Sequence, residues 1–209
     1  SNISFYGEHA MILNHLWGLY AHPLEEWQTI DNRHESLTYS LSHILLIALF
    51  PSVMGYYSSV YLGWSIGTGN PVFLTHESAL MIGAAMYVAL IGGVFALAYL
   101  AHWMAVTFGA KPTFTQTIEL AAYTATPVFM SALAAFWPEL WFVVCVGLVA
   151  LAYSVYLLYT GVPILMHIPQ ERGFIYASSV VTCGLILLVI ILALTAMLWT
   201  NGIISPMFT

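Results

Sequence analysis

The chain of 209 residues is 61% hydrophobic and only 6% charged, with a formal net charge of −6. Its mean hydropathy is +0.88. Soluble domains carry about 25% charged residues, so this composition excludes an ordinary soluble protein and indicates a membrane protein. Three basic residues in total are too few to neutralise a run of phosphates, so we expect no nucleic-acid partner.

We expect residues 1–36 to form a cytoplasmic N-terminal segment and residues 37–209 to form a membrane domain. Met11 is a candidate start, which would make residues 1–10 an upstream extension or a remnant of cloning. Pro23 followed by Glu25 and Glu26 suits a helix start, because proline loses no hydrogen bond there and acids favour the positive end of the dipole. This pattern predicts a short helix over residues 23–31, at the cytoplasmic interface or against the bundle. Its acidic character favours docking on protein over binding anionic lipid.

His15, His22 and His34 in the same segment are candidate metal ligands. Their spacing matches no compact metal motif such as H-E-x-x-H, and three separate stretches would have to converge. The alternative is that they are ordinary interfacial histidines. We expect neither a metal nor a cofactor.

Five stretches approach the roughly 20 apolar residues that cross a bilayer. The third is the least hydrophobic of them. No internal repeat or flexible linker separates them. The sequence therefore predicts an all-α, polytopic bundle with spans at residues 38–62, 78–108, 114–136, 140–162 and 174–200.

The few basic residues predict the orientation of the bundle, because cytoplasmic loops retain Lys and Arg. Arg33, Lys111 and Arg172 all flank the spans on one side, so we expect a cytoplasmic N-terminus and an external C-terminus in a bacterial inner membrane. Tryptophans prefer the headgroup level and provide an independent check. Trp103 falls at an inner end, and the predicted outer ends carry Trp64, Trp137, Trp141 and Trp199.

Polar residues gather on single faces of the third and fourth spans, and together they predict a polar seam between these helices. Prolines accompany them, and each proline leaves the carbonyl four residues earlier without its usual donor. Pro127 releases the Tyr123 carbonyl, for which nearby hydroxyls are candidate donors. The seam comprises Glu119, Tyr123, Thr126 and Pro127 of the third span and Tyr153, Tyr156, Tyr159, Thr160, Gly161 and Pro163 of the fourth.

Two interpretations of this seam remain open. It is either interhelical hydrogen bonding, at about 0.6–2 kcal/mol per bond, or the lining of a path for a solute, proton or metal. Glu119 likewise either reaches the inner interface near Lys111 or handles protons and cations within the bundle. No catalytic motif or phosphate loop is present, so we expect no enzymatic activity.

Three stretches resemble a known family. AYTATPVFMSAL at 122–133 and YSVYLLYTGVPILMHIPQERG at 153–173 are similar to the paired signature of the Yip (Ypt-interacting protein) family. LWGLYAHPLEEW at 16–27 resembles its bacterial inner-membrane branch. The resemblance implies five spans, a cytosolic N-terminus and no enzymatic activity.

Eukaryotic members of this family act in membrane traffic and bind small GTPases and one another. This sequence carries no Asp-Leu-Tyr-Gly-Pro element, so we do not expect GTPase binding. The leading hypothesis is a non-enzymatic membrane protein that organises or assists other membrane components, in contact with lipid and with copies of itself or other membrane proteins. The alternative is a small transporter or channel that uses the polar seam.

Overall fold

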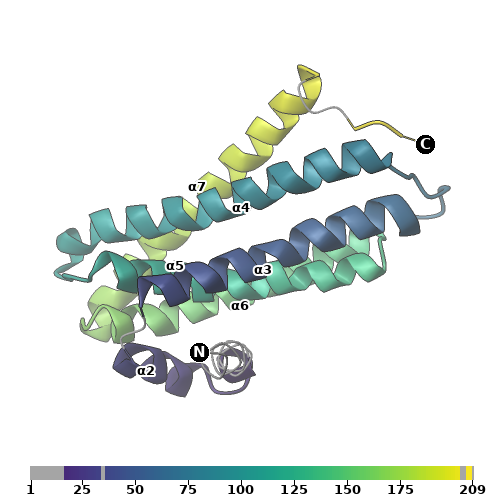
Figure 1. Cartoon of the computed structure of the whole chain (residues 1–209). Coiled ribbons are helices and arrows are strands. Elements are labelled where there is room, and N and C mark those ends of the chain that lie inside the picture. The colour runs from purple at the N-terminus through teal and green to yellow at the C-terminus, as the bar shows by residue number, and fades with distance from the viewer. Residues whose placement is uncertain (1–16, 34–35, 203–205, 209) are drawn as a thin grey trace, which may run out of the picture.

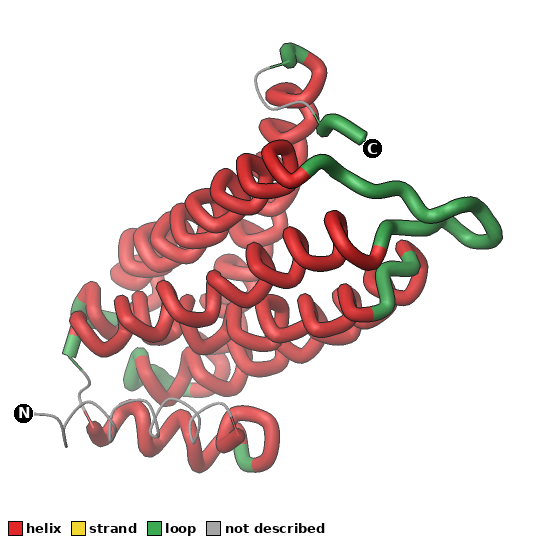
Figure 2. Tube along the Cα trace, turned by 45° about the vertical axis from the view of Figure 1, so that its right-hand side comes forward, coloured by secondary structure: helices red, strands yellow, loops and turns green. Residues whose placement is uncertain are grey.

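The computed structural model describes residues 17–33, 36–202 and 206–208. Within these residues it confirms the predicted all-α bundle, with five helical segments long and apolar enough to cross a membrane. The helices run up and down with short connections, apart from a longer connection between α3 and α4 (Figures 1 and 2). The only pairings of extended backbone in the described residues are isolated bridges.

The five spans begin and end close to the predicted boundaries. The first is α3 (Leu37–Tyr57) continued by the π-helix η1 (Ser58–Leu62), and the second is α4 (His76–Ala105) continued by the 3-10 helix η2 (Val106–Phe108). The third is α5 (Phe114–Met130) followed by the 3-10 helix η3 (Ser131–Phe136). The last two are α6 (Leu140–Leu165) and α7 (Gln170–Thr200).

Three boundaries extend beyond the apolar residues because local hydrogen bonds, not hydropathy, set where a helix begins or ends. The side chain of Thr75 accepts a hydrogen bond from the Ser78 backbone N–H, so α4 begins at His76. The second boundary is the end of α6, which continues past Pro163 to Leu165. The corner into α7 follows Leu165, and α7 begins at Gln170, ahead of its first apolar residue.

The least hydrophobic span lies at the centre of the bundle. In the most apolar window of each span, α5 with η3 is 61% buried within the protein, against 11% for α4, 11% for α6 and 6% for α7. Figure 1 shows α7 leaning away from the other helices toward its C-terminal end. The first span is intermediate at 44%. Because α5 meets protein where α4, α6 and α7 are mostly exposed, it can carry polar residues that a lipid-facing helix cannot.

Two clusters of buried apolar residues lie on either side of α5. One contains Leu120 and Tyr123 of α5 together with residues of α6 and α7. The other contains Ile118 and Ala122 of α5 together with residues of α3 and α4. Because α4 also contributes to both clusters, with Ala101 and Ala105 in the first and Val94 and Ala98 in the second, α4 and α5 together join the two sides of the bundle.

The predicted N-terminal helix is confirmed as α2 (Pro23–Arg33), and residues 17–21 are also helical. It docks against α6, and Trp27 and Ile30 are fully buried there. Its acid Glu25 is exposed, whereas Asp31 is only 18% exposed and pairs with His167, just beyond the end of α6. Between the two positions open from the sequence, the structure therefore places α2 against the bundle.

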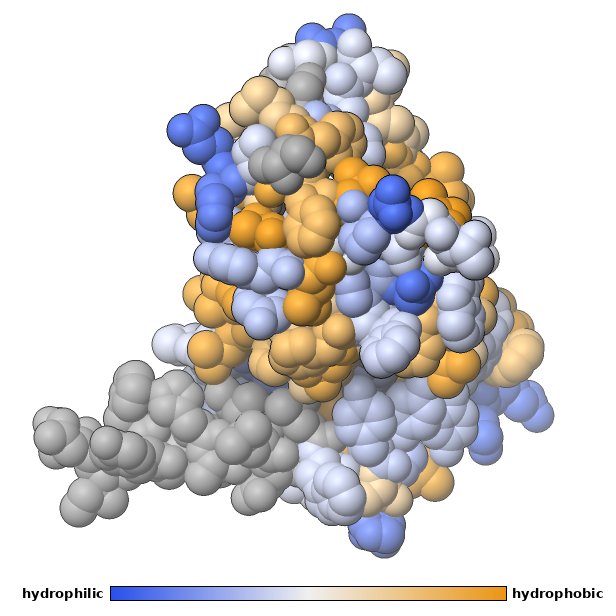
Figure 3. Space-filling model, turned by 90° about the vertical axis from the view of Figure 1, so that its right-hand side faces the viewer, coloured by the Kyte–Doolittle hydropathy of each residue, from blue (hydrophilic) through white to orange (hydrophobic). Residues whose placement is uncertain are grey.

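Each end of the bundle has its own set of connecting contacts. At one end, isolated bridges join Ser65 to Glu139 and Leu74 to Phe208, which ties the α3–α4 connection to the α5–α6 corner and the C-terminal residues. Figure 3 looks onto this end, where hydrophilic residues interleave with hydrophobic ones. At the other end lie α2, the α4–α5 connection and the α6–α7 corner (Figure 1).

Candidate functional site

The polar residues of α5 face α2 and α3 inside the bundle. Thr126 is fully buried, and its hydroxyl oxygen lies 3.1 Å from Nε2 of His43 on α3. The same hydroxyl donates its proton to the Ala122 carbonyl at 2.9 Å. With its one proton directed at this carbonyl, the Thr126 hydroxyl is placed to accept a hydrogen bond from the N–H of His43 Nε2.

Tyr123 lies between aromatic rings from two other helices. Its ring centroid is 4.7 Å from that of His43 and 6.2 Å from that of Trp27 on α2, the latter in an edge-to-face arrangement. Glu119, one helical turn away on α5, is only 3% exposed. We call His43, Glu119, Tyr123 and Thr126 the α5 polar core.

Pro127 is also buried. The threonine hydroxyls beside it do not bond the carbonyl that Pro127 leaves without its helical donor. Thr124 donates to the carbonyls of Leu120 and Ala121, and Thr126 donates to that of Ala122. The released carbonyl is that of Tyr123. These hydroxyls thus reinforce the preceding turn of their own helix.

The tyrosines of α6 point toward different neighbours from Tyr123 of α5. Tyr153 donates a 2.6 Å hydrogen bond to the Leu19 carbonyl and stacks on Tyr20. Tyr159 shares a 2.7 Å hydrogen bond with Ser178 on α7. Burial, with a smaller contribution from Tyr153, raises the pKa of the Tyr20 phenol above its usual 10.0, so this ring stays neutral.

The remaining seam residues of α6 are also distributed over several neighbours. Tyr156 is exposed on the helix surface, and Thr160 bonds the Tyr156 and Leu157 carbonyls of its own helix. The structure therefore brings Glu119, Tyr123 and Thr126 together, but it directs the α6 residues toward the N-terminal segment, α7 and the exterior. The polar groups do not form one continuous line between α5 and α6.

Gly161 and Pro163 are packing positions at which neighbouring helices approach closely. A Cβ at Gly161 would lie 2.6 Å from the indole ring of Trp27, so only glycine leaves room for this ring. A Cβ at Gly173 on α7 would lie 2.7 Å from the ring of Pro163. Trp27 thus contacts both Tyr123 and Gly161, and the three stretches with family resemblance meet at one side chain.

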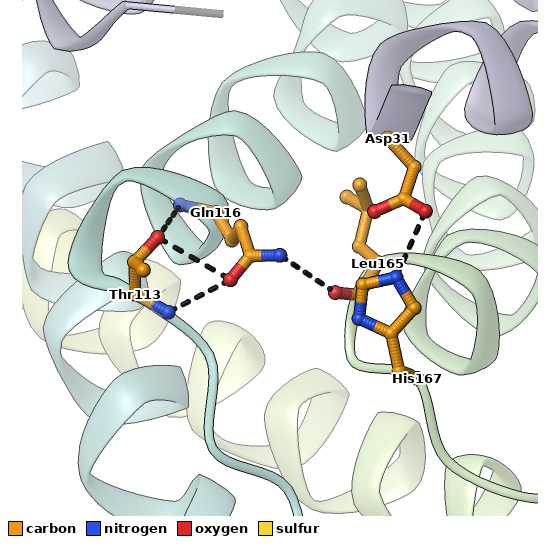
Figure 4. Close-up of polar contacts among 5 residues, drawn as sticks. All are labelled: Asp31, Thr113, Gln116, Leu165 and His167. Atoms are coloured by element: carbon orange, nitrogen blue, oxygen red, sulfur yellow. Dashed lines mark hydrogen bonds and ion pairs between the residues drawn. The ribbon is translucent and has the colours of Figure 1, made fainter. Parts of the chain in front are cut away.

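Several of these contacts could not be found from the sequence. Nothing in the spacing of His43 or Trp27 indicates that α5 is the partner. At the basic end of the bundle, Nε2 of His167 lies 2.9 Å from Oδ2 of Asp31, and Gln116 donates to the Leu165 carbonyl at 3.3 Å. Figure 4 shows how these contacts join α2 and α5 to the α6–α7 corner.

Of the candidate metal ligands, His15 and His34 lie outside the described residues. His22 is exposed. Among the residues that the structure describes, no group of three or more His, Cys, Asp or Glu side chains is arranged to hold a metal ion.

A cavity of about 220 Å³ lies between α4, α5, α6 and α7. Its lining is apolar except for Thr124 and Ser154, and it includes Gly93 of α4 and Gly184 of α7. None of the predicted seam residues lines it. An apolar space of this kind suits hydrocarbon chains and offers no ligands to an ion.

A bundle of five membrane-length helices, with the least apolar of the five at its centre, is the architecture of a polytopic integral membrane protein. The model of the Yip1 domain matches residues 17–191, and the chain therefore belongs to the Yip1 family. The inner membrane protein YohC of Escherichia coli K12 is 34% identical over 191 residues, which cover 91% of this chain and 98% of that protein. YohC of E. coli O6:H1 matches equally well. No solved structure matches the chain.

The close approach at Gly161 predicts the effect of adding one methyl group there. We expect Gly161→Ala to displace the Trp27 ring and to lower the free energy of unfolding by about 1–3 kcal/mol. The matched control is Gly147→Ala on the same helix, where a Cβ meets nothing within 4 Å. Thermal unfolding in detergent measures both, and equal melting temperatures would contradict the close packing.

The buried Thr126 hydroxyl predicts a second effect. Thr126→Val keeps the shape of the side chain but removes a hydrogen-bond partner of His43, and we expect a loss of about 1–3 kcal/mol in unfolding free energy. Thr182→Val is the control, because the Thr182 hydroxyl is exposed and bonds a carbonyl of its own helix. The same unfolding assay should show little change for Thr182→Val, and an unchanged Thr126→Val protein would count against the assigned bond.

Proposed function

We propose that this chain is a non-enzymatic integral protein of the bacterial inner membrane that organises or assists other membrane components. The observation that carries this proposal is that the family's signature residues pack between helices. Tyr123, Gly161 and Pro163 pack against Trp27 and Gly173 and hold helices together. Residues used in this way support a fixed scaffold with lateral surfaces for partners, rather than a reaction centre.

The location in the inner membrane rests on the relative YohC, which is described as an inner membrane protein. The five apolar helices agree with it. We further propose that residues 1–36 form an N-terminal segment and residues 37–209 the five-span domain. Because α2 docks on α6, the two parts act as one unit.

Transport is the second candidate, and two observations weigh against it. The α5 polar core is buried by α2 and α3, and the cavity beside it is lined almost entirely by apolar groups. Proton or ion transfer needs a continuous series of polar groups or water. Proteoliposomes that moved protons, metals or small solutes faster than empty vesicles would favour transport over the scaffold.

The scaffold proposal predicts stable association in the membrane. Crosslinking followed by affinity purification at native expression should recover a stoichiometric membrane partner or a defined homo-oligomer. Gly161→Ala should weaken this association if α2 helps to shape the surface, whereas Gly147→Ala should not. Recovery of monomer alone from all three proteins would contradict the proposal.

The three basic residues support an orientation with the N-terminus in the cytoplasm and the C-terminus outside. Green fluorescent protein fused at the N-terminus or beside Lys111 should therefore fluoresce. Alkaline phosphatase fused beside Asn70 or at the C-terminus should be active. The reverse pattern would overturn the orientation while leaving the five-span fold intact.

A further inference from the structure

The N-terminal segment and α6 run side by side in the same direction. Tyr153 bonds the Leu19 carbonyl, the Gly161 position receives the Trp27 ring, and His167 pairs with Asp31. The N-terminal residues and their α6 partners thus increase together along the chain. These contacts define a parallel alignment of residues 19–31 with the second half of α6 and its corner.

Followed backwards from Arg33 to Trp17, the segment therefore runs from the basic end of the bundle into the depth of the bilayer. Tyr153 lies twelve residues before Leu165, the end of α6, which corresponds to about 18 Å along the helix. Because a bilayer core is only about 30 Å thick, a contact at this position lies below the headgroups even when α6 is tilted. Trp27, opposite Gly161, lies much nearer to the surface.

The segment exposes three large apolar side chains, which we call its apolar edge. Trp17, Tyr20 and Leu24 are 75%, 46% and 53% exposed. Hydrogen bonds from the His22 N–H to the Gly18 carbonyl and from the Glu26 N–H to the His22 carbonyl close the helical turns before and after His22, where the helix is interrupted. Trp17 and Tyr20 therefore lie before this break, and Leu24 lies after it.

This apolar edge continues the lipid-facing surface of α6. Tyr20 stacks on Tyr153 with ring centroids 5.5 Å apart, and Tyr153 contacts the exposed Tyr156 at 5.7 Å. Val149, four residues before Tyr153 on α6, is 72% exposed. The acid Glu25, which directly follows Leu24, and the amide Asn32 are exposed on a different side of the segment from Leu24.

We propose that residues 17–33 form a half-inserted element, held against α6, whose edge of Trp17, Tyr20 and Leu24 contacts lipid acyl chains of the leaflet at the basic end. The segment enters the leaflet without crossing it, so Trp17 and Tyr20 lie deepest, and Leu24 and Glu25 lie nearer to the headgroups. This arrangement goes beyond the proposed scaffold function and does not depend on which side of the membrane is cytoplasmic.

Spin labels on single cysteines test the position of this edge. In a Cys145→Ala/Cys183→Ala background, Leu24→Cys and its neighbour Glu25→Cys are labelled and reconstituted into phosphatidylethanolamine–phosphatidylglycerol vesicles. Val149→Cys provides a lipid-facing reference, and Ile66→Cys, 78% exposed in the α3–α4 connection, provides an aqueous one. The measured quantity is the accessibility of the label to oxygen relative to a water-soluble nickel chelate.

We expect the oxygen-to-nickel ratio of Leu24→Cys to approach that of Val149→Cys and to exceed that of Glu25→Cys several-fold. Trp17→Cys is a second, independent position with the same expected result. Both side chains lie off the docking face, so their replacement should leave α2 seated. Ratios at Leu24 and Trp17 that match Glu25 and Ile66 would overturn the insertion, even if the scaffold function holds.

Discussion

The insertion of the Trp27 ring at Gly161 is the contact on which the arrangement of the N-terminal half depends. The indole ring fills the space of a missing side chain on α6 and meets the edge of Tyr123 on α5. This one side chain fixes the spacing of α2, α5 and α6. The ring is completely buried, and the acid Asp31 of the same helix pairs with His167 at the α6–α7 corner.

The burial of Tyr123 in turn makes a polar α5 possible. A helix with Glu119, Thr124 and Thr126 near its middle would be costly if it faced lipid, since unsatisfied polar groups find no partner there. Here α2, α3, α4 and α6 surround it, and Thr126 bonds His43 while Thr124 bonds its own helix. The more apolar α4, α6 and α7 remain outside and face the lipid.

The same packing explains why the family's signature stretches occur together. They lie far apart in the chain, at the N-terminal segment, the third span and the fourth span, yet they meet at Trp27. A signature that encodes contact between helices is consistent with a protein whose role is to hold a shape in the membrane. It also gives a physical reason for glycine in the fourth span, where a tight approach rather than backbone flexibility requires it.

The sequence alone determined the five spans, the short α2 and the family, because hydropathy, helix-start residues and local motifs act within a few turns of chain. It also identified α5 as unusual through its polar residues. Only the tertiary structure decided what those residues contact. Side-chain direction depends on helix rotation and on which helices are neighbours, and neither is set by spacing along one helix. The residues expected to form one seam are therefore divided, with Tyr123 and Thr126 facing Trp27 and His43, and Tyr153 and Tyr159 facing the N-terminal segment and α7.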